Sequence, residues 1–131
     1  SPDVDAWRPD APVPGATLPS ARVTRDGDEL HLGDALGTRP LAIVYGTADL
    51  PDAERAGIDV VRVWRDDDPG ARNAGAVVDR FGSVRTRLDL ADGGVYLVRP
   101  DGHVAARRRD VDADTLVPLV RRLEGAHAAP A

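Results

Sequence analysis

The sequence contains no cysteine, and this absence excludes disulfides, thiolate nucleophiles and cysteine-bound metals together. It leaves the redox compartment undetermined, because cytosolic and exported proteins can both lack cysteine. Methionine is absent as well, so we expect a chain that begins at Ser1 to be a processed product or, as we favour, a piece excised from a longer protein. Aromatic residues make up only 4%, so valine, leucine and alanine must fill most of the core.

Acidic residues outnumber basic ones. No segment is apolar enough to span a membrane. Every basic residue is an arginine and the net charge is −5, which argues against nucleic acid or an anionic membrane as the main partner. No apolar run approaches the roughly 20 residues that cross a bilayer, and no signal peptide is visible. We therefore expect a cytoplasmic protein. The arginines at 107–109 precede Asp110, and we expect them to form a solvated strand end rather than a phosphate site.

The proline distribution divides the chain. Residues 1–20 contain five prolines, and because proline fixes φ and donates no hydrogen bond, this stretch is predicted to be a linker or an extended lead-in. Residues 21–125 are predicted to form one globular domain and residues 126–131 a tail. Trp7 in the lead-in is costly to expose, so it packs either on this domain or on a neighbour outside the chain. The sequence does not say which, nor what Trp64 packs against.

Six short segments are predicted to be strands. Residues 21–24 and 29–32 flank Asp26-Gly27, a dipeptide that suits a tight hairpin turn. The apolar run over residues 41–45 is typical of a strand buried on both faces, and residues 58–64 predict a second strand with alternating side chains. The last two strands, over residues 95–98 and 104–106, are joined by a turn-forming sequence at residues 99–103.

Three segments favour helix, and residues 33–36 favour a single helical turn. The first helix is predicted over residues 49–57, with Asp49 as its N-cap and Gly57 at its end. The third is predicted from about residue 115 to Gly125. The second is predicted over residues 74–81, with Gly82 as its C-cap, because four apolar residues fall at helical spacing there: Ala74, Val77, Val78 and Phe81.

The order of these elements predicts an α/β fold in which helices flank a mixed β-sheet. This layout resembles the thioredoxin fold without its CxxC motif. In active thioredoxins the cysteine pair follows the first core strand, at the N-terminus of a helix, and a cis-proline precedes the penultimate strand. The resemblance places the vacated redox motif at Thr47, Ala48, Asp49 and Leu50, and it puts Gly94 where the cis-proline is missing.

A second resemblance is more specific. Residues 96–107, with the sequence YLVRPDGHVAAR, are similar to a hairpin in the C-terminal domain of FAD-dependent aromatic-ring hydroxylases. That group includes the phenylpropionate, pentachlorophenol and polyketide hydroxylases. Residues 14–19 resemble the entry into the same domain, and residues 32–37 resemble an element that often follows it, in the same order and spacing. The resemblance gives a structural role to the hairpin residues Arg99, Pro100, Asp101, Gly102 and His103.

The resemblance implies a redox-inactive appendage with no catalytic residue, cofactor or metal of its own. FAD and NAD(P)H are implied for the parent enzyme, outside this chain. The expected partners are the flavin and substrate domains of the same polypeptide, with a homodimer as a further option. Ser20, Arg22 and Ala106 depart from the family pattern and are expected to face the rest of the enzyme or the surface. The alternative is a free-standing redox-inactive thioredoxin-like binding module.

Other candidate sites carry little weight. Gly33-Asp34-Ala35 superficially resembles a flavin-contacting motif, but no glycine- and proline-rich helix entry follows it. His31, His103 and His127 are too scattered to propose a metal site. The aspartates at 66–68 lack the alternating ligand spacing of a calcium loop.

Overall fold

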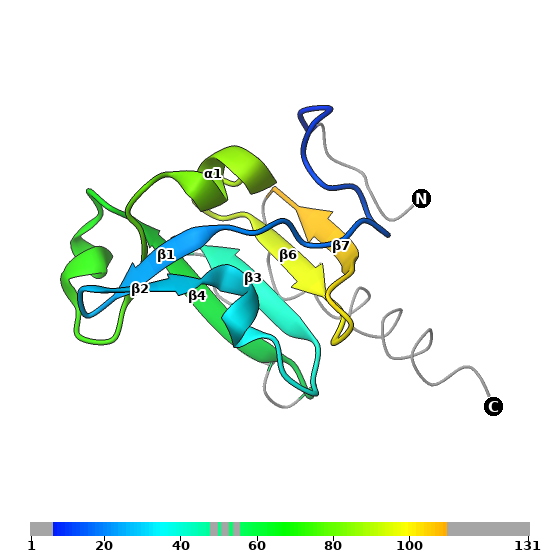
Figure 1. Cartoon of the computed structure of the whole chain (residues 1–131), viewed down its shortest axis with the longest axis horizontal. Helices are drawn as coiled ribbons and strands as arrows, with labels where there is room; N and C mark the ends of the chain where they lie inside the picture. Colours follow the sequence, from blue (N-terminus) through cyan, green and yellow to red (C-terminus); the bar gives the residue numbers. More distant parts are fainter. Residues whose placement is uncertain (1–6, 48–49, 51–52, 54–55, 110–131) are drawn as a thin grey trace.

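The computed structural model describes residues 7–47, 50, 53 and 56–109 of the chain. These residues form one seven-stranded sheet in the order β2-β1-β5-β4-β3-β6-β7 (Figure 1). The pairs β3–β4 and β4–β5 are parallel and the others are antiparallel, so the predicted mixed sheet is confirmed. The strands are β1 Arg22–Arg25, β2 Asp28–His31, β3 Leu41–Tyr45, β4 Asp59–Arg65, β5 Val77–Asp79, β6 Val95–Val98 and β7 Val104–Arg108.

The first two strands form the predicted hairpin. Asp26 and Gly27 form its turn, with φ values of 51° and 87°. Both values lie in the left-handed region, which short aspartate and glycine residues tolerate and which a two-residue turn of this kind requires. The 3-10 helix η1, Leu32–Ala35, follows the hairpin at the position of the predicted helical turn.

Strand β3 lies in the middle of the sheet, and all five of its residues are buried. Its alternate side chains face two separate cores, as a strand covered on both faces requires. The first core includes residues of the helix α1, Ser83–Leu88, together with Ile43 and Tyr45. The second core joins Ala42 and Val44 to residues from the segment that follows β3.

The prediction of a helix over residues 74–81 is wrong. Val77 belongs to β5, which pairs in parallel with β4 and antiparallel with β1. The apolar spacing fits a helix, but pairing with two neighbouring strands determines the conformation. Gly82, with a φ of 70°, precedes α1 instead of ending a helix. Phe81, expected on the buried stripe, is 49% exposed.

The second predicted hairpin lies within the described residues, whereas two of the predicted helices lie mostly or wholly outside them. β6 and β7 confirm the second hairpin, and β7 extends two residues further than predicted. Ala106 was expected at the surface or facing the parent; this is wrong, because its side chain belongs to the second core and is 3% exposed. The helix predicted over residues 115–125 lies outside the described residues, as does most of that over residues 49–57. A second 3-10 helix, η2, spans Pro69–Arg72.

Candidate functional site

The first part of the candidate site is the hairpin turn between β6 and β7. The backbone N–H of Gly102 donates to the carbonyl of Arg99 at 2.9 Å, which closes a turn with Pro100 at its second position. The carboxylate of Asp101 accepts the backbone N–H of His103 at 3.0 Å and forms an ion pair with Arg99. The backbone hydrogen bond from His103, followed by the Arg99 guanidinium, lowers the pKa of Asp101 to about 2. The motif residues therefore build a rigid turn.

The lead-in pairs with the outer edge of this hairpin. The N–H of Leu18 donates to the carbonyl of Gly102 at 2.8 Å, and that of Gly15 donates to the carbonyl of Val104 at 2.7 Å. The N–H of Val104 returns a hydrogen bond to the carbonyl of Ala16 at 2.8 Å. These bonds cover polar groups that a bare edge strand would leave open to another chain. Residues 15–18 therefore act as a short additional strand.

Trp7 packs on this domain. The guanidinium groups of Arg107 and Arg109 both lie near its ring, with their carbon atoms 4.6 Å and 4.0 Å from the ring centroid. The ring also meets Tyr96 edge-on, with 5.4 Å between the ring centroids. Stacking of arginine on tryptophan is favourable and strengthens when water is excluded. We call Trp7, Asp89, Tyr96, Arg107 and Arg109 the lead-in clasp.

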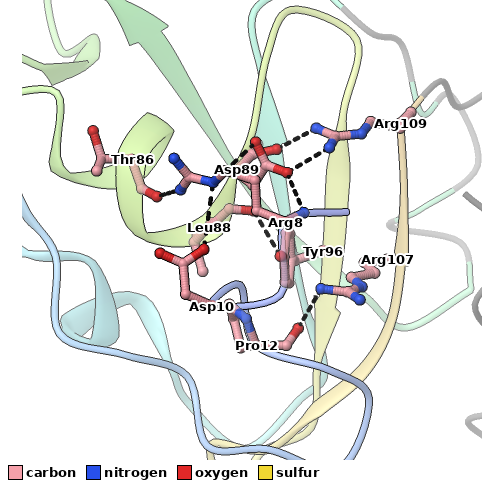
Figure 2. Close-up of polar contacts among 9 residues, drawn as sticks. All are labelled: Arg8, Asp10, Pro12, Thr86, Leu88, Asp89, Tyr96, Arg107 and Arg109. Atoms are coloured by element: carbon pink, nitrogen blue, oxygen red, sulfur yellow. Dashed lines mark hydrogen bonds and ion pairs between the residues drawn. The ribbon is translucent and has the colours of Figure 1, made fainter. Parts of the chain in front are cut away.

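Asp89 is the anionic centre of the clasp (Figure 2). It ends α1 in the left-handed conformation, with a φ of 52°, and its carboxylate accepts the backbone N–H of Arg8 at 2.9 Å. The same carboxylate forms an ion pair with Arg109. Burial alone would raise the pKa of Asp89, but the bonds from Arg8 and Arg109 outweigh it and lower that pKa below its usual value.

Two further bonds tie the clasp to the sheet and the lead-in. The hydroxyl of Tyr96 donates to the carbonyl of Leu88 at 2.6 Å, and Arg107 donates to the carbonyl of Pro12 at 2.9 Å (Figure 2). Arg107 is only 4% exposed. The expectation that the arginines at 107–109 form a solvated strand end is therefore wrong for Arg107. Pro12, whose carbonyl accepts from Arg107, lies 95 residues away in the chain, where no local pattern could reveal it.

A carboxylate lies next to Thr47, where the resemblance to thioredoxins places the start of the vacated redox motif. The backbone N–H of Thr47 donates to Asp92 at 2.9 Å, and its hydroxyl lies 3.1 Å from the other oxygen of Asp92. A Cβ added to Gly46 would lie 1.7 Å from the Asp92 carboxylate, so this close approach requires glycine. Leu50 is buried in the second core, whereas Ala48 and Asp49 lie outside the described residues.

Gly94 is also closely packed, although less tightly than Gly46. A Cβ there would lie 2.8 Å from the side chain of Leu90 and 3.2 Å from the carbonyl of Ala91. The described part of the chain contains no cis peptide bond. The loop over residues 91–94 therefore folds tightly over the end of β3, where Gly93 and Gly94 exchange backbone hydrogen bonds with Tyr45.

A buried aspartate that the sequence did not single out organises α1. Asp79 is 3% exposed, and its carboxylate accepts the backbone N–H groups of Val84 at 3.0 Å and Arg85 at 2.9 Å. It also accepts the hydroxyl of Tyr45 at 2.8 Å. Burial and the hydrogen bond to Asp79 raise the pKa of Tyr45. Both carboxylate oxygens of Asp79 therefore accept hydrogen bonds that stabilise the start of α1.

The described part of the chain contains neither a cluster of potential metal ligands nor a helix that could span a membrane. Residues 7–47, 50, 53 and 56–109 contain no group of three potential ligands that could hold a metal ion. His31 and His103 lie in separate contacts, with Ser20 and Asp101 respectively, and His127 is outside the described residues. Within the same ranges, no helix has the length and apolar character needed to cross a bilayer.

Comparison with known structures agrees with this geometry. The thioredoxin domain of the thiol-disulfide oxidoreductase BVU-2223 from Bacteroides vulgatus matches with a TM-score of 0.61 and 15% identity, over 86% of this chain and 99% of that one. The fold and the corner at Thr47 thus define a thioredoxin-like domain without a cysteine pair. A family model described as the C-terminal domain of aromatic-ring hydroxylases matches residues 11–126, so the chain belongs to that family.

Two solved flavin enzymes extend the comparison. Aklavinone-11 hydroxylase, in a ternary complex with FAD and aklavinone, has 27% identity and a TM-score of 0.67 over 84% of this chain. The flavin-dependent monooxygenase PieE, in complex with FAD and substrate, has 22% identity and a TM-score of 0.65 over 88% of this chain. This chain spans only 21% of the length of each. No curated protein matched the chain by sequence.

Proposed function

We propose that this chain is the redox-inactive, structural C-terminal domain of a cytoplasmic FAD-dependent aromatic monooxygenase. The match of residues 11–126 to the hydroxylase C-terminal family carries the proposal. FAD and NAD(P)H bind outside this chain, where the flavin performs the oxygen chemistry. The partners are the flavin and substrate domains of the same polypeptide, and a second copy is a further candidate.

Two features of the structure support a non-catalytic role. Hydrogen bonds join Thr47 to Asp92 at the corner where the resemblance to thioredoxins places the vacated redox motif, and the chain has no cysteine. The lead-in is fixed to the sheet by backbone bonds and by the clasp around Trp7. A fixed lead-in gives the domain a defined orientation relative to whatever precedes it, which suits a structural part.

The proposal is tested on the complete polypeptide. We expect its reading frame to continue upstream into a strand–turn–helix unit with the sequence G-x-G-x-x-G, which binds dinucleotides. The purified polypeptide should bind FAD and oxidise NAD(P)H faster when an aromatic substrate is present. A reading frame that starts near Ser1 with its own start codon would instead support a free-standing binding module and contradict the proposal.

A further inference from the structure

Strand β4 has an open edge beside an exposed apolar surface. β5 pairs only with Val63–Arg65 of β4, so among the described residues the stretch 59–62 has a strand partner, β3, on one side only. A groove of about 400 Å³ is lined by this part of β4 and by the loop over residues 73–76. An edge of this kind presents backbone N–H and C=O groups that can pair with another segment.

Val60 is an exposed apolar residue at this edge. It is 41% exposed, although its register partner Ala42 on β3 is fully buried on the same face. Parallel strands such as β3 and β4 normally have both faces covered. The second core covers this face over β3, but the cover does not extend to Val60 on β4.

The groove has a rigid aromatic wall. The guanidinium of Arg62 lies 5.8 Å from the ring of Trp64 and also donates to the carbonyl of Gly46. A Cβ added to Gly70 would lie 2.7 Å from three ring atoms of Trp64, so the backbone of η2 packs directly on the ring. A side chain held in this way loses little freedom on binding, which favours association.

The other exposed apolar residues do not form a comparable surface. Phe81 is 49% exposed, but the guanidinium of Arg22 lies 5.3 Å from its ring centroid, and charged side chains line the adjoining cleft. Val13, which is 53% exposed, is a single residue on the lead-in. Single exposed apolar residues are normal on a protein surface and require no partner. Val60 differs because it continues into the groove with Trp64.

We propose that the groove along β4 binds an extended segment of the same polypeptide from outside this chain, which adds a strand beside residues 59–62. The inference rests on the function proposed above. The segment would place an apolar side chain against Val60 and Trp64. It would also carry a carboxylate, because Arg25 and Arg62 line the groove and no described lining residue is acidic, although the whole chain carries a charge of −5.

The length of the similar enzymes favours an occupant from the same polypeptide. This chain corresponds to 21% of each of the two flavin enzymes, so most of such a polypeptide lies outside it. A segment joined through the chain is present at a high effective concentration and competes well against any diffusing partner. Strand addition also satisfies the unpaired backbone groups of residues 59–62, which a loosely apposed surface would leave to water.

The test uses thiol labelling in the complete polypeptide. This chain has no cysteine, so the variants Val60→Cys, Val13→Cys and Phe81→Cys each introduce one thiol here, and mass spectrometry separates its peptide from any native cysteine elsewhere. Relative to the same polypeptide in urea, Val60→Cys should react about tenfold more slowly than the two controls. Backbone amide exchange of Val60 and Arg62, whose N–H groups point away from β3 in this register, should be slow as well, because strand addition protects them.

The outcomes separate this inference from the proposed function. Equal labelling of all three variants together with fast amide exchange would overturn the inference, even in a polypeptide that binds FAD. Protection of Val60→Cys that disappears on dilution would also overturn it, because a second copy would then be the occupant. Protection that is independent of concentration and is lost when Arg62 is replaced by Glu supports it. A polypeptide without a flavin domain would refute the proposed function itself.

Discussion

The edge of the sheet at β7 and the edge at residues 59–62 of β4 differ in what pairs with them. Along β7, the lead-in pairs its own backbone with Gly102 and Val104, and the clasp holds it there with Trp7. Along β4, residues 59–62 have no second strand among the described residues, and Val60 is 41% exposed. Within the part of the chain that the structure describes, the lead-in covers one edge, and residues 59–62 form an edge without a second strand. Substitutions should therefore be costly on the closed side and inexpensive on the open side.

The largest expected effect is at the closed corner of β3. Gly46→Ala should destabilise the fold by about 3 kcal/mol, since alanine is disfavoured at a φ of 78° and its Cβ would overlap Asp92. The control Gly75→Ala, at a φ of 76° with open space around it, should cost only about 1 kcal/mol. Urea unfolding of the purified protein measures both values.

A second substitution checks the cause of this loss. Adding Asp92→Ala to Gly46→Ala removes the overlap but not the backbone strain, so the double variant should recover about half of the lost stability. If Gly46→Ala costs no more than Gly75→Ala, the corner is not closed in the way described.

The clasp should give the next largest effect. Trp7→Ala removes the ring that Arg107 and Arg109 contact, and we expect a loss of about 2–3 kcal/mol, somewhat less than for a fully buried tryptophan. Val13→Ala, a change at an exposed position of the same lead-in, should stay within about 0.5 kcal/mol. Similar losses for both variants would mean that the lead-in contributes through its backbone alone.

The buried and the exposed parts of one face of the parallel pair β3–β4 offer a direct comparison. Val44→Ala in the buried second core should cost about 2 kcal/mol, whereas Val60→Ala on the exposed part of the same face should cost less than about 1 kcal/mol. Denaturant midpoints of the two variants provide the measurement. In the complete polypeptide, a cost for Val60→Ala close to that of Val44→Ala would indicate that the groove is occupied.

The smallest effect concerns the charge of Asp89. Asp89→Asn keeps a side chain that tolerates the left-handed conformation but removes the anion, and it should cost about 1 kcal/mol at pH 7. The folded state lowers the pKa of Asp89, so its contribution is complete above the unfolded value of about 3.9 and is lost as the pH falls through the folded value. The difference in stability between the two proteins should therefore shrink below about pH 4.

The sequence predicted correctly those elements whose signals lie in consecutive residues. Asp26-Gly27 determines the first hairpin, the residues 99–103 determine the second, and the apolar run at residues 41–45 marks the central strand, because each signal is contained in a few consecutive positions. Val77 could not be assigned in the same way. Its helical spacing is real, but pairing with β1 and β4 decides its conformation.

The clasp and the closed corner could not be predicted because their partners are far apart in the chain. Arg8 meets Asp89 across 81 residues, and Thr47 meets Asp92 across 45. The resemblance correctly indicated the family and the fold, yet it left open where Trp7 would pack. The contacts of Trp7 with Tyr96 and Arg109 became visible only in three dimensions.

The assignment of this domain as the accessory C-terminal part of a flavin hydroxylase is tested most directly by locating the FAD. Limited proteolysis of the flavin-loaded complete polypeptide, followed by native mass spectrometry of the fragments, shows which part keeps the cofactor. We expect FAD to remain with a fragment that ends before residue 14, and the fragment with residues 14–107 to carry none. FAD retained by the fragment with residues 14–107 would contradict the assignment.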